Sequence, residues 1–163
     1  MKYSEIKAVK AFCNELYSKP NWREVVDNLV NFEWDFTVEG VRFINETAID
    51  SIQCDELAAD DYKLGRFASW LLADVLTIPK HLIDRMQMNG EYETLGMLVK
   101  SQDGLEDLQK EYSKIDGYGH HFNGYDGSEQ ELRLPNGEFY WVFDEQVWIN
   151  LMMNILYMCK VMR

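Results

Sequence analysis

The sequence is poor in cysteine, proline and glycine: its 163 residues include only three Cys, three Pro and ten Gly. The cysteines, Cys13, Cys54 and Cys159, form neither a CxxC pair nor a zinc-ligand pattern, and their odd number argues against a disulfide framework. So little proline and glycine leaves no room for long linkers or low-complexity tracts. These scarcities predict a single globular domain spanning residues 1–163, with its thiols reduced.

Long hydrophobic runs are also missing. The N-terminus lacks the apolar core of a signal peptide. The most apolar segment, residues 147–162, contains Asn150, Asn154 and Lys160 and is too short to span a bilayer. Its apolar side chains surround most of a helix, which indicates a central core helix or an interface with a second copy of the chain. We therefore expect a cytoplasmic protein with no membrane partner, and a homodimer is one form that it could take.

No catalytic motif is present. Gly117 and Gly119 begin a GxGxxG pattern that Phe122 breaks, and neither a GxSxG nor a P-loop sequence occurs. A nucleophile such as Cys54 or Ser69 needs a neighbouring base and an orienting acid, and the spacing provides no such set. The sequence therefore predicts a protein that is not an enzyme and has no cofactor.

Residues 116–129 combine four glycines with aromatic side chains and two adjacent histidines, His120 and His121. Adjacent side chains diverge, and no second ligand pair at helical spacing completes a metal site. We interpret the segment as a structured loop anchored by aromatic residues, and we expect Tyr118, His120 and Tyr125 to form a recognition patch.

Periodicity predicts the fold class, which is α+β, mainly helical, with two β-hairpins forming a small antiparallel sheet. In the first hairpin Glu39-Gly40 makes the turn, and in the second Asn136-Gly137 favours a type I′ turn. Ser4 and Asn21 are the expected N-caps of the first two helices, and Glu24 would complete a capping box with Asn21. The expected elements are helices at 4–18 and 21–30, a hairpin at about 32–44, short helices after it, helices within 62–101 that break at 77–79 and 88–90, a helix within 102–115, a hairpin at about 131–143 and a final helix.

Negative charge is what the sequence has in excess, with 28 acidic residues, 16 basic residues and a net charge of −12. Such a chain repels nucleic acid. Between Phe43 and Tyr62 there is no Lys or Arg, and six carboxylates occur. A run of this kind is usually a solvated face that aids solubility. The alternative is a mimic of nucleic-acid phosphates that binds a protein built to grip nucleic acid. The six residues are Glu46, Asp50, Asp55, Glu56, Asp60 and Asp61.

In size, charge and class, the chain resembles small acidic phage and prophage proteins, including DNA-mimic inhibitors of restriction and CRISPR systems. Residues 64–99 and 116–143 also resemble small uncharacterised phage proteins. The resemblance implies an anti-defence protein that acts in the host cytoplasm by protein–protein interaction. Its partner would be a host protein that binds nucleic acid. The six carboxylates would form the partner-binding surface, with Tyr118, His120 and Tyr125 as a second patch.

Residues 71–86 resemble a helix-turn-helix, with the small residue Ala73 in the first helix and Thr77 where the usual turn glycine stands. Leu76, Ile78, Ile83 and Met86 fit the apolar positions of that pattern. The resemblance implies a nucleic-acid-binding module or transcriptional regulator, and an ordinary helical hairpin fits the same pattern. Direct nucleic-acid binding is disfavoured, because residues 62–101 hold five basic against four acidic side chains. The residues that would face nucleic acid are Lys80, His81, Arg85 and Gln87.

Overall fold

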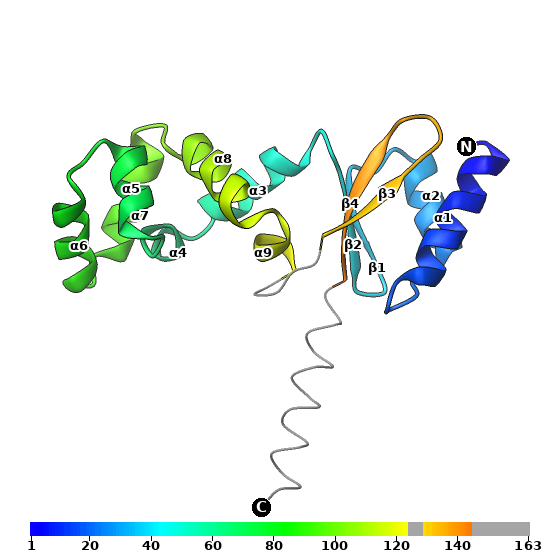
Figure 1. Ribbon diagram of the computed structural model, residues 1–163, viewed down its shortest axis with the longest axis horizontal. Helices are drawn as coiled ribbons and strands as arrows, with labels where there is room; N and C mark the ends of the chain where they lie inside the picture. Colours follow the sequence, from blue (N-terminus) through cyan, green and yellow to red (C-terminus); the bar gives the residue numbers. More distant parts are fainter. Residues whose placement is uncertain (124–128, 145–163) are drawn as a thin grey trace, which may run out of the picture. The chain divides into compact units, whose positions relative to one another are not determined.

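The computed structural model describes residues 1–123 and 129–144 (Figure 1). These residues form nine helices and one four-stranded antiparallel sheet, which confirms the α+β, mainly helical class. The apolar segment 147–162, with Cys159, and the loop residue Tyr125 lie outside the described residues.

The chain divides into two compact units. We call Met1–Ile49, together with the chain from Tyr118 onward, the sheet unit, and Asp50–Gly117 the helical unit. Each has its own cluster of buried apolar side chains. A domain is defined by cooperative unfolding as well as by compactness. That residues 1–163 behave as a single domain therefore stays a prediction.

Both predicted hairpins are confirmed, and they share one sheet with the strand order β1-β2-β4-β3. The first hairpin pairs β1 (Asp35–Val38) with β2 (Val41–Asn45), and the second pairs β3 (Gln130–Arg133) with β4 (Phe139–Asp144). Antiparallel pairing of β2 with β4 joins them, with Phe43 opposite Val142.

The two hairpin turns differ in type. Glu39 and Gly40 both have positive φ, 50° and 80°, as a type I′ turn requires. The type I′ prediction for Asn136-Gly137 is wrong, because only Gly137 has positive φ (96°). Pro135 fixes a negative φ that suits the second position of a type I turn, so the loop becomes a three-residue connection with glycine last. The N–H of Leu134 donates to the carbonyl of Glu138 (2.8 Å) across that loop.

One face of the sheet is covered by α1 (Tyr3–Glu15) and α2 (Trp22–Val30), which lie side by side in Figure 1. Phe36 and Val38 of β1 are buried there while their neighbours in the strand are exposed, as alternation requires. Val9 of α1 and Val25 of α2 belong to the same buried cluster.

The beginnings of these two helices correct two expectations. Helix α1 starts at Tyr3 with Lys2 as its N-cap, so Ser4 is not the cap. Asn21 caps α2 as predicted, since its Oδ1 accepts from the N–H of Arg23 (3.2 Å). The capping box with Glu24 is wrong, because the backbone N–H of Asn21 donates to Glu39 Oε2 instead (3.0 Å). The carboxylate on the first hairpin turn thus does what Glu24 was expected to do.

The opposite face of the sheet receives α9 (Gly119–Phe122). The ring of Phe122 lies 5.0 Å from that of Phe143, and the Arg42 guanidinium lies 5.0 Å from the centre of the Phe122 ring. Just before α9, Tyr118 packs against Trp141 at 5.3 Å. The aromatic loop is therefore anchored on the sheet, as its composition predicted.

The helical unit contains α3 (Ile49–Ala58), α4 (Asp61–Gly65), α5 (Ser69–Leu76), α6 (Lys80–Met88), α7 (Tyr92–Ser101) and α8 (Leu105–Asp116). Its core is mostly leucine, and Leu64, Leu72 and Leu95 are fully buried. Helices α4 and α7 approach so closely that a Cβ at Gly65 would lie 1.9 Å from the Tyr92 carbonyl oxygen, and one at Gly96 would lie 2.1 Å from that of Asp61. Only glycine fits at these two positions.

Four helices end on a left-handed residue, and in each case the next residue donates its N–H to the carbonyl five positions earlier, the hydrogen bond of a Schellman motif. Glycine is the usual residue there because it has no Cβ to strain. Among these four helix ends only that of α6 uses glycine. The four residues are Phe32 after α2 (φ 59°), Thr77 after α5 (φ 55°), Gly90 after α6 (φ 77°) and Asp103 after α7 (φ 54°).

Candidate interaction surfaces

The six carboxylates of the acidic stretch do not all belong to one unit. Glu46 follows β2 in the sheet unit and is exposed. The other five lie on or between α3 and α4 in the helical unit. A surface made by all six is therefore not a feature of either unit alone.

Asp60 and Asp61 hold α4 in place. Asp60 is the N-cap, with its Oδ1 accepting from the N–H of Lys63 (2.9 Å). Asp61 lies 2.5 Å from Lys100 Nζ of α7 and is only 26% exposed. Lys100 also donates to the carbonyl of Ala58 (3.1 Å). Both carboxylates thus form contacts within the unit.

Asp50 belongs to a polar network that joins α3 to α8. Its Oδ1 accepts from Gln109 Nε2 (2.7 Å), and Gln109 is almost fully buried. The same nitrogen contacts Gln53 Oε1 and Ser113 Oγ, both at 2.9 Å. A buried amide needs such partners, since each unpaired polar group costs about 1–3 kcal/mol. One oxygen of Asp50 therefore serves the packing of the two helices.

Asp55 and Glu56 are exposed on α3. Close to them, burial raises the pKa of the Cys54 thiol, and the charges of Glu106, Asp50 and Asp55 raise it further. The charges of carboxylates from both α3 and α8 thus act on this thiol, although Lys110 of α8 partly offsets them. The raised pKa keeps Cys54 protonated, so it is a poor nucleophile.

Glu106 is a site residue that the sequence analysis missed. It is far from the acidic stretch in sequence, and only the packing of α8 on α3 brings it there. The acidic first turn of α8, Glu106 and Asp107, is visible in the sequence, but its neighbour in the fold is not.

The second expected patch has only one exposed side chain among its described members. His120 is exposed on α9, whereas Tyr118 is half-buried against Trp141. The loop is closed by Glu129, whose Oε1 accepts from the N–H of Gly119 (2.7 Å). Within residues 1–123 and 129–144, no group of three or more His, Cys, Asp or Glu is placed to hold a metal ion.

Helices α5 and α6 have the connection that the helix-turn-helix resemblance implies. Thr77 takes the left-handed conformation of the usual turn glycine, and the N–H of Ile78 donates to the carbonyl of Ala73 (3.1 Å). Leu76 and Ile83 are buried on the two helices, as the pattern requires.

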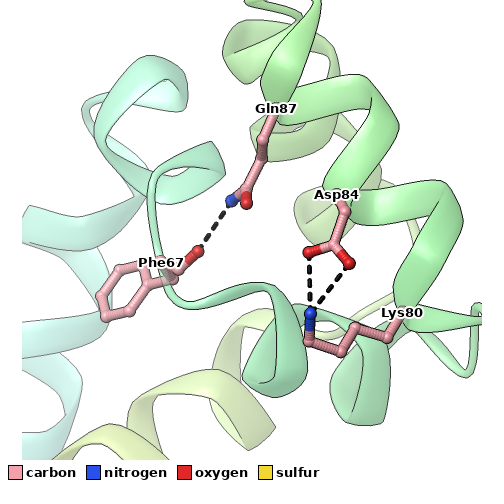
Figure 2. A network of polar contacts seen from close by, with 4 residues as sticks. All are labelled: Phe67, Lys80, Asp84 and Gln87. Carbon is pink, nitrogen blue, oxygen red and sulfur yellow. Dashed lines mark hydrogen bonds and ion pairs between the residues drawn. The ribbon is translucent and has the colours of Figure 1, made fainter.

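Two of the four side chains expected to face nucleic acid are engaged within the unit (Figure 2). Lys80 Nζ lies 2.9 and 2.8 Å from the oxygens of Asp84, and its hydrogen bond lowers the Asp84 pKa. Gln87 Nε2 donates to the carbonyls of Gly65 (2.9 Å) and Phe67 (2.8 Å). His81 and Arg85 are exposed. Helix α6 therefore offers a weaker basic surface than its sequence predicts.

Comparisons with protein-family models, with curated proteins and with solved structures gave no match to this chain. No helix of the described residues is both long enough and apolar enough to cross a membrane.

Proposed function

We propose that the chain is a non-enzymatic inhibitor that binds the basic surface of a host protein through carboxylates of its helical unit. The observation that supports this most is that carboxylates of two different helices, Asp50, Asp55 and Glu106, all lie near enough to Cys54 for their charges to raise its pKa. Two helices that contribute carboxylates to one surface make an extended negative array. Such an array complements a protein surface that grips phosphates.

The charge of the whole helical unit agrees with this. Residues 50–117 contain fourteen Asp and Glu but only seven Lys and Arg. Excess charge of one sign speeds association with an oppositely charged partner, and salt weakens the effect. The contact residues are Asp55 and Glu56 on α3 and Glu106 on α8, which are exposed. Asp50, Asp60 and Asp61 contribute charge while they hold the unit together.

The proposal has a biological setting. The partner is a host nucleic-acid-binding protein of a restriction or CRISPR system, and the chain acts in the host cytoplasm as a product of a phage or mobile element. His120 and the tyrosines of its loop form a second patch. A second copy of the chain, joined through residues 147–162, is a further candidate partner.

The experiment is displacement of fluorescent duplex DNA from purified restriction and CRISPR effector complexes by the full chain. We expect displacement that weakens from 50 to 200 mM salt. The double variant Asp55→Lys/Glu56→Lys should lose at least tenfold in potency. The matched control, Glu15→Lys/Asp27→Lys, reverses two exposed charges of the sheet unit and should displace DNA as potently as the unchanged chain. Equal loss of potency in the two double variants, or no displacement of DNA from any complex, would contradict the proposal.

The left-handed turn at Thr77 favours a second candidate function, direct nucleic-acid binding by α5 and α6. His81 and Arg85 would then contact phosphates or bases. A gel-shift series tests this, since binding must weaken steeply with salt and Arg85→Ala must reduce it. Binding that is unaffected by Arg85→Ala would exclude α6 as the contact.

A further inference from the structure

A small pocket opens at one end of the sheet, where β1 begins, β2 ends and β4 begins. Its volume is about 190 Å³. Three aromatic side chains and two carboxylates line it, and none of its lining residues is Lys or Arg. The lining residues are Phe32, Trp34, Asn45, Glu46, Thr47, Glu138 and Tyr140.

Two of the aromatic side chains are open to solvent, Phe32 at 74% and Trp34 at 58% exposure. Neighbouring aromatic side chains left in water are typical of interaction sites, because they bring large contact areas at low entropy cost. Tyr140 is different, since its ring is buried and its hydroxyl donates to the backbone carbonyl of Glu33 (3.5 Å). The pocket therefore has an aromatic rim and a fixed polar floor.

The backbone at Phe32 adds a second observation. Phe32 is the left-handed residue after α2, with φ 59°, where glycine would fit without strain. A left-handed conformation strains an L-residue, because its Cβ comes too close to the following carbonyl oxygen. The Schellman motif after α2 sets this conformation, and a bulky aromatic residue is rarely found in it. Because this strained residue lies on the pocket rim, its exposed ring is available to contact a ligand.

The charge of the pocket selects its ligand. Glu46 and Glu138 are the charged groups that line it. Asn136 Nδ2 donates to one oxygen of Glu138 (3.0 Å), which holds that carboxylate in position. Aromatic faces and carboxylates both attract cations, and together they form a site for an organic cation.

Hydrogen bonding narrows the class of cation. A guanidinium group is planar, stacks on aromatic rings and carries five N–H donors that match carboxylate oxygens. A quaternary ammonium has no donor and would form no hydrogen bond with either carboxylate. We propose that this pocket binds the guanidinium group of an arginine side chain on a partner protein. The site belongs to the sheet unit and does not depend on the carboxylates of α3 and α8.

The test is a titration of the ¹⁵N-labelled full chain followed through the indole N–H signal of Trp34, assigned with Trp34→Phe. The probe is N-acetyl-arginine amide, and N-acetyl-citrulline amide is its neutral isostere. We expect a saturable shift with the arginine probe and at least tenfold weaker binding of citrulline. Equal binding of the two would overturn the role of charge. If tetramethylammonium bound as tightly as the arginine probe, the assignment to a guanidinium group would be overturned. If free arginine bound more tightly than the blocked probe, the ligand would be the free amino acid and not an arginine side chain of a protein.

Variants locate the site. Phe32→Gly places the favoured residue in the left-handed position, so the chain should stay folded while affinity falls at least tenfold. Glu138→Gln should reduce affinity several-fold. The matched control Tyr17→Ser removes an aromatic that is 65% exposed outside the pocket and should leave binding unchanged. Unchanged affinity in Phe32→Gly, with an otherwise native spectrum, would refute the proposal.

Discussion

The two units use their carboxylates differently. In the helical unit, Asp60 caps α4, Asp61 pairs with Lys100 and Asp50 accepts from a buried amide. In the sheet unit, Glu46 and Glu138 line a pocket with aromatic rings and no basic side chain. Net charge alone does not reveal this difference. Other carboxylates of the sheet unit do serve its fold, since Glu39 accepts from Asn21 and Asp35 pairs with Arg42, so the difference lies at the pocket and not in the whole unit.

The two units also differ in where they place glycine. The helical unit places Gly65 and Gly96 where any side chain would strike the backbone of another helix. The sheet unit places Phe32 where glycine would be relaxed. The first arrangement favours stability, whereas the second sacrifices stability and exposes an aromatic ring. Left-handed residues other than glycine also follow helices of the helical unit, at Thr77 and Asp103, so Phe32 differs from them in carrying an exposed aromatic ring.

The largest expected effect comes from breaking the packing of α4 on α7. In Gly96→Ala the new Cβ would lie 2.1 Å from the Asp61 carbonyl oxygen, so the helices must separate. We expect a loss of about 3 kcal/mol or more in the free energy of unfolding, at the upper end for overpacking. Urea denaturation followed by far-ultraviolet circular dichroism measures it.

The matched control is Thr94→Ala on the exposed side of the same helix, which should change stability by less than about 0.5 kcal/mol. The same variants test the single-domain prediction. If the chain is one cooperative domain, Gly96→Ala lowers the midpoints of sheet and helix signals together. Separate transitions, with the sheet unit unaffected, would show two domains.

Local pattern was enough to predict most of the fold. Alternating side chains located both hairpins, and helical spacing found the breaks after α5 and α6. The turn at Asn136-Gly137 shows the limit, because Pro135 one residue earlier changed the turn type. Neighbours in sequence can alter a turn as strongly as the two residues at its centre.

The candidate sites could be predicted less well, because they depend on contacts between distant residues. Spacing could not show that Asp61 meets Lys100 or that Gln87 binds the carbonyls of Gly65 and Phe67. The acidic stretch was visible as a count of charges, but its division between two units was not. The pocket rim was harder still, since a left-handed Phe32 contradicts local preference.

Alkaline pH should destabilise both units. Burial raises the pKa of Cys13 in the sheet unit from 9.0 to about 11 and that of Tyr112 in the helical unit from 10.0 to about 12. Between the unfolded and folded pKa values the unfolded chain has lost a proton that the folded chain retains, so stability falls as pH rises. The pKa of Cys54 in the helical unit is also raised from 9.0, so both units should lose stability from about pH 9, and Cys13 should account for about 1–2 kcal/mol of the loss.

Urea titrations from pH 8 to pH 11 measure this loss. Cys13→Ala removes the titrating thiol, so its stability should depend less on pH between 9 and 11 even though the cavity lowers stability throughout. An unchanged pH dependence in this variant would show that another group causes the loss.

A smaller effect distinguishes two helix ends with the same geometry. Phe32→Gly relieves a left-handed aromatic after α2 and should raise the free energy of unfolding by about 0.5–1 kcal/mol. Gly90→Ala does the reverse after α6 and should lower it by about 1 kcal/mol. A Cβ at Gly90 would meet no atom within 4 Å, so backbone strain alone causes the loss. Thermal or urea denaturation checks both signs, and a destabilised Phe32→Gly would mean that the ring packs in the folded state.

The smallest expected effect separates carboxylates that hold the helical unit together from carboxylates that remain available. Asp61→Asn removes the charge that pairs with Lys100, and because the pair is partly exposed we expect a loss of only about 0.5 kcal/mol. Asp55→Asn removes an exposed charge from an acidic surface, so stability should stay the same or rise slightly. Urea denaturation at low salt measures both. If Asp55→Asn lost as much as Asp61→Asn, Asp55 would belong to the fold and could not serve a partner. A stable Asp55→Asn that displaced less DNA would instead show that the carboxylate serves binding, because the variant would lose potency without losing stability.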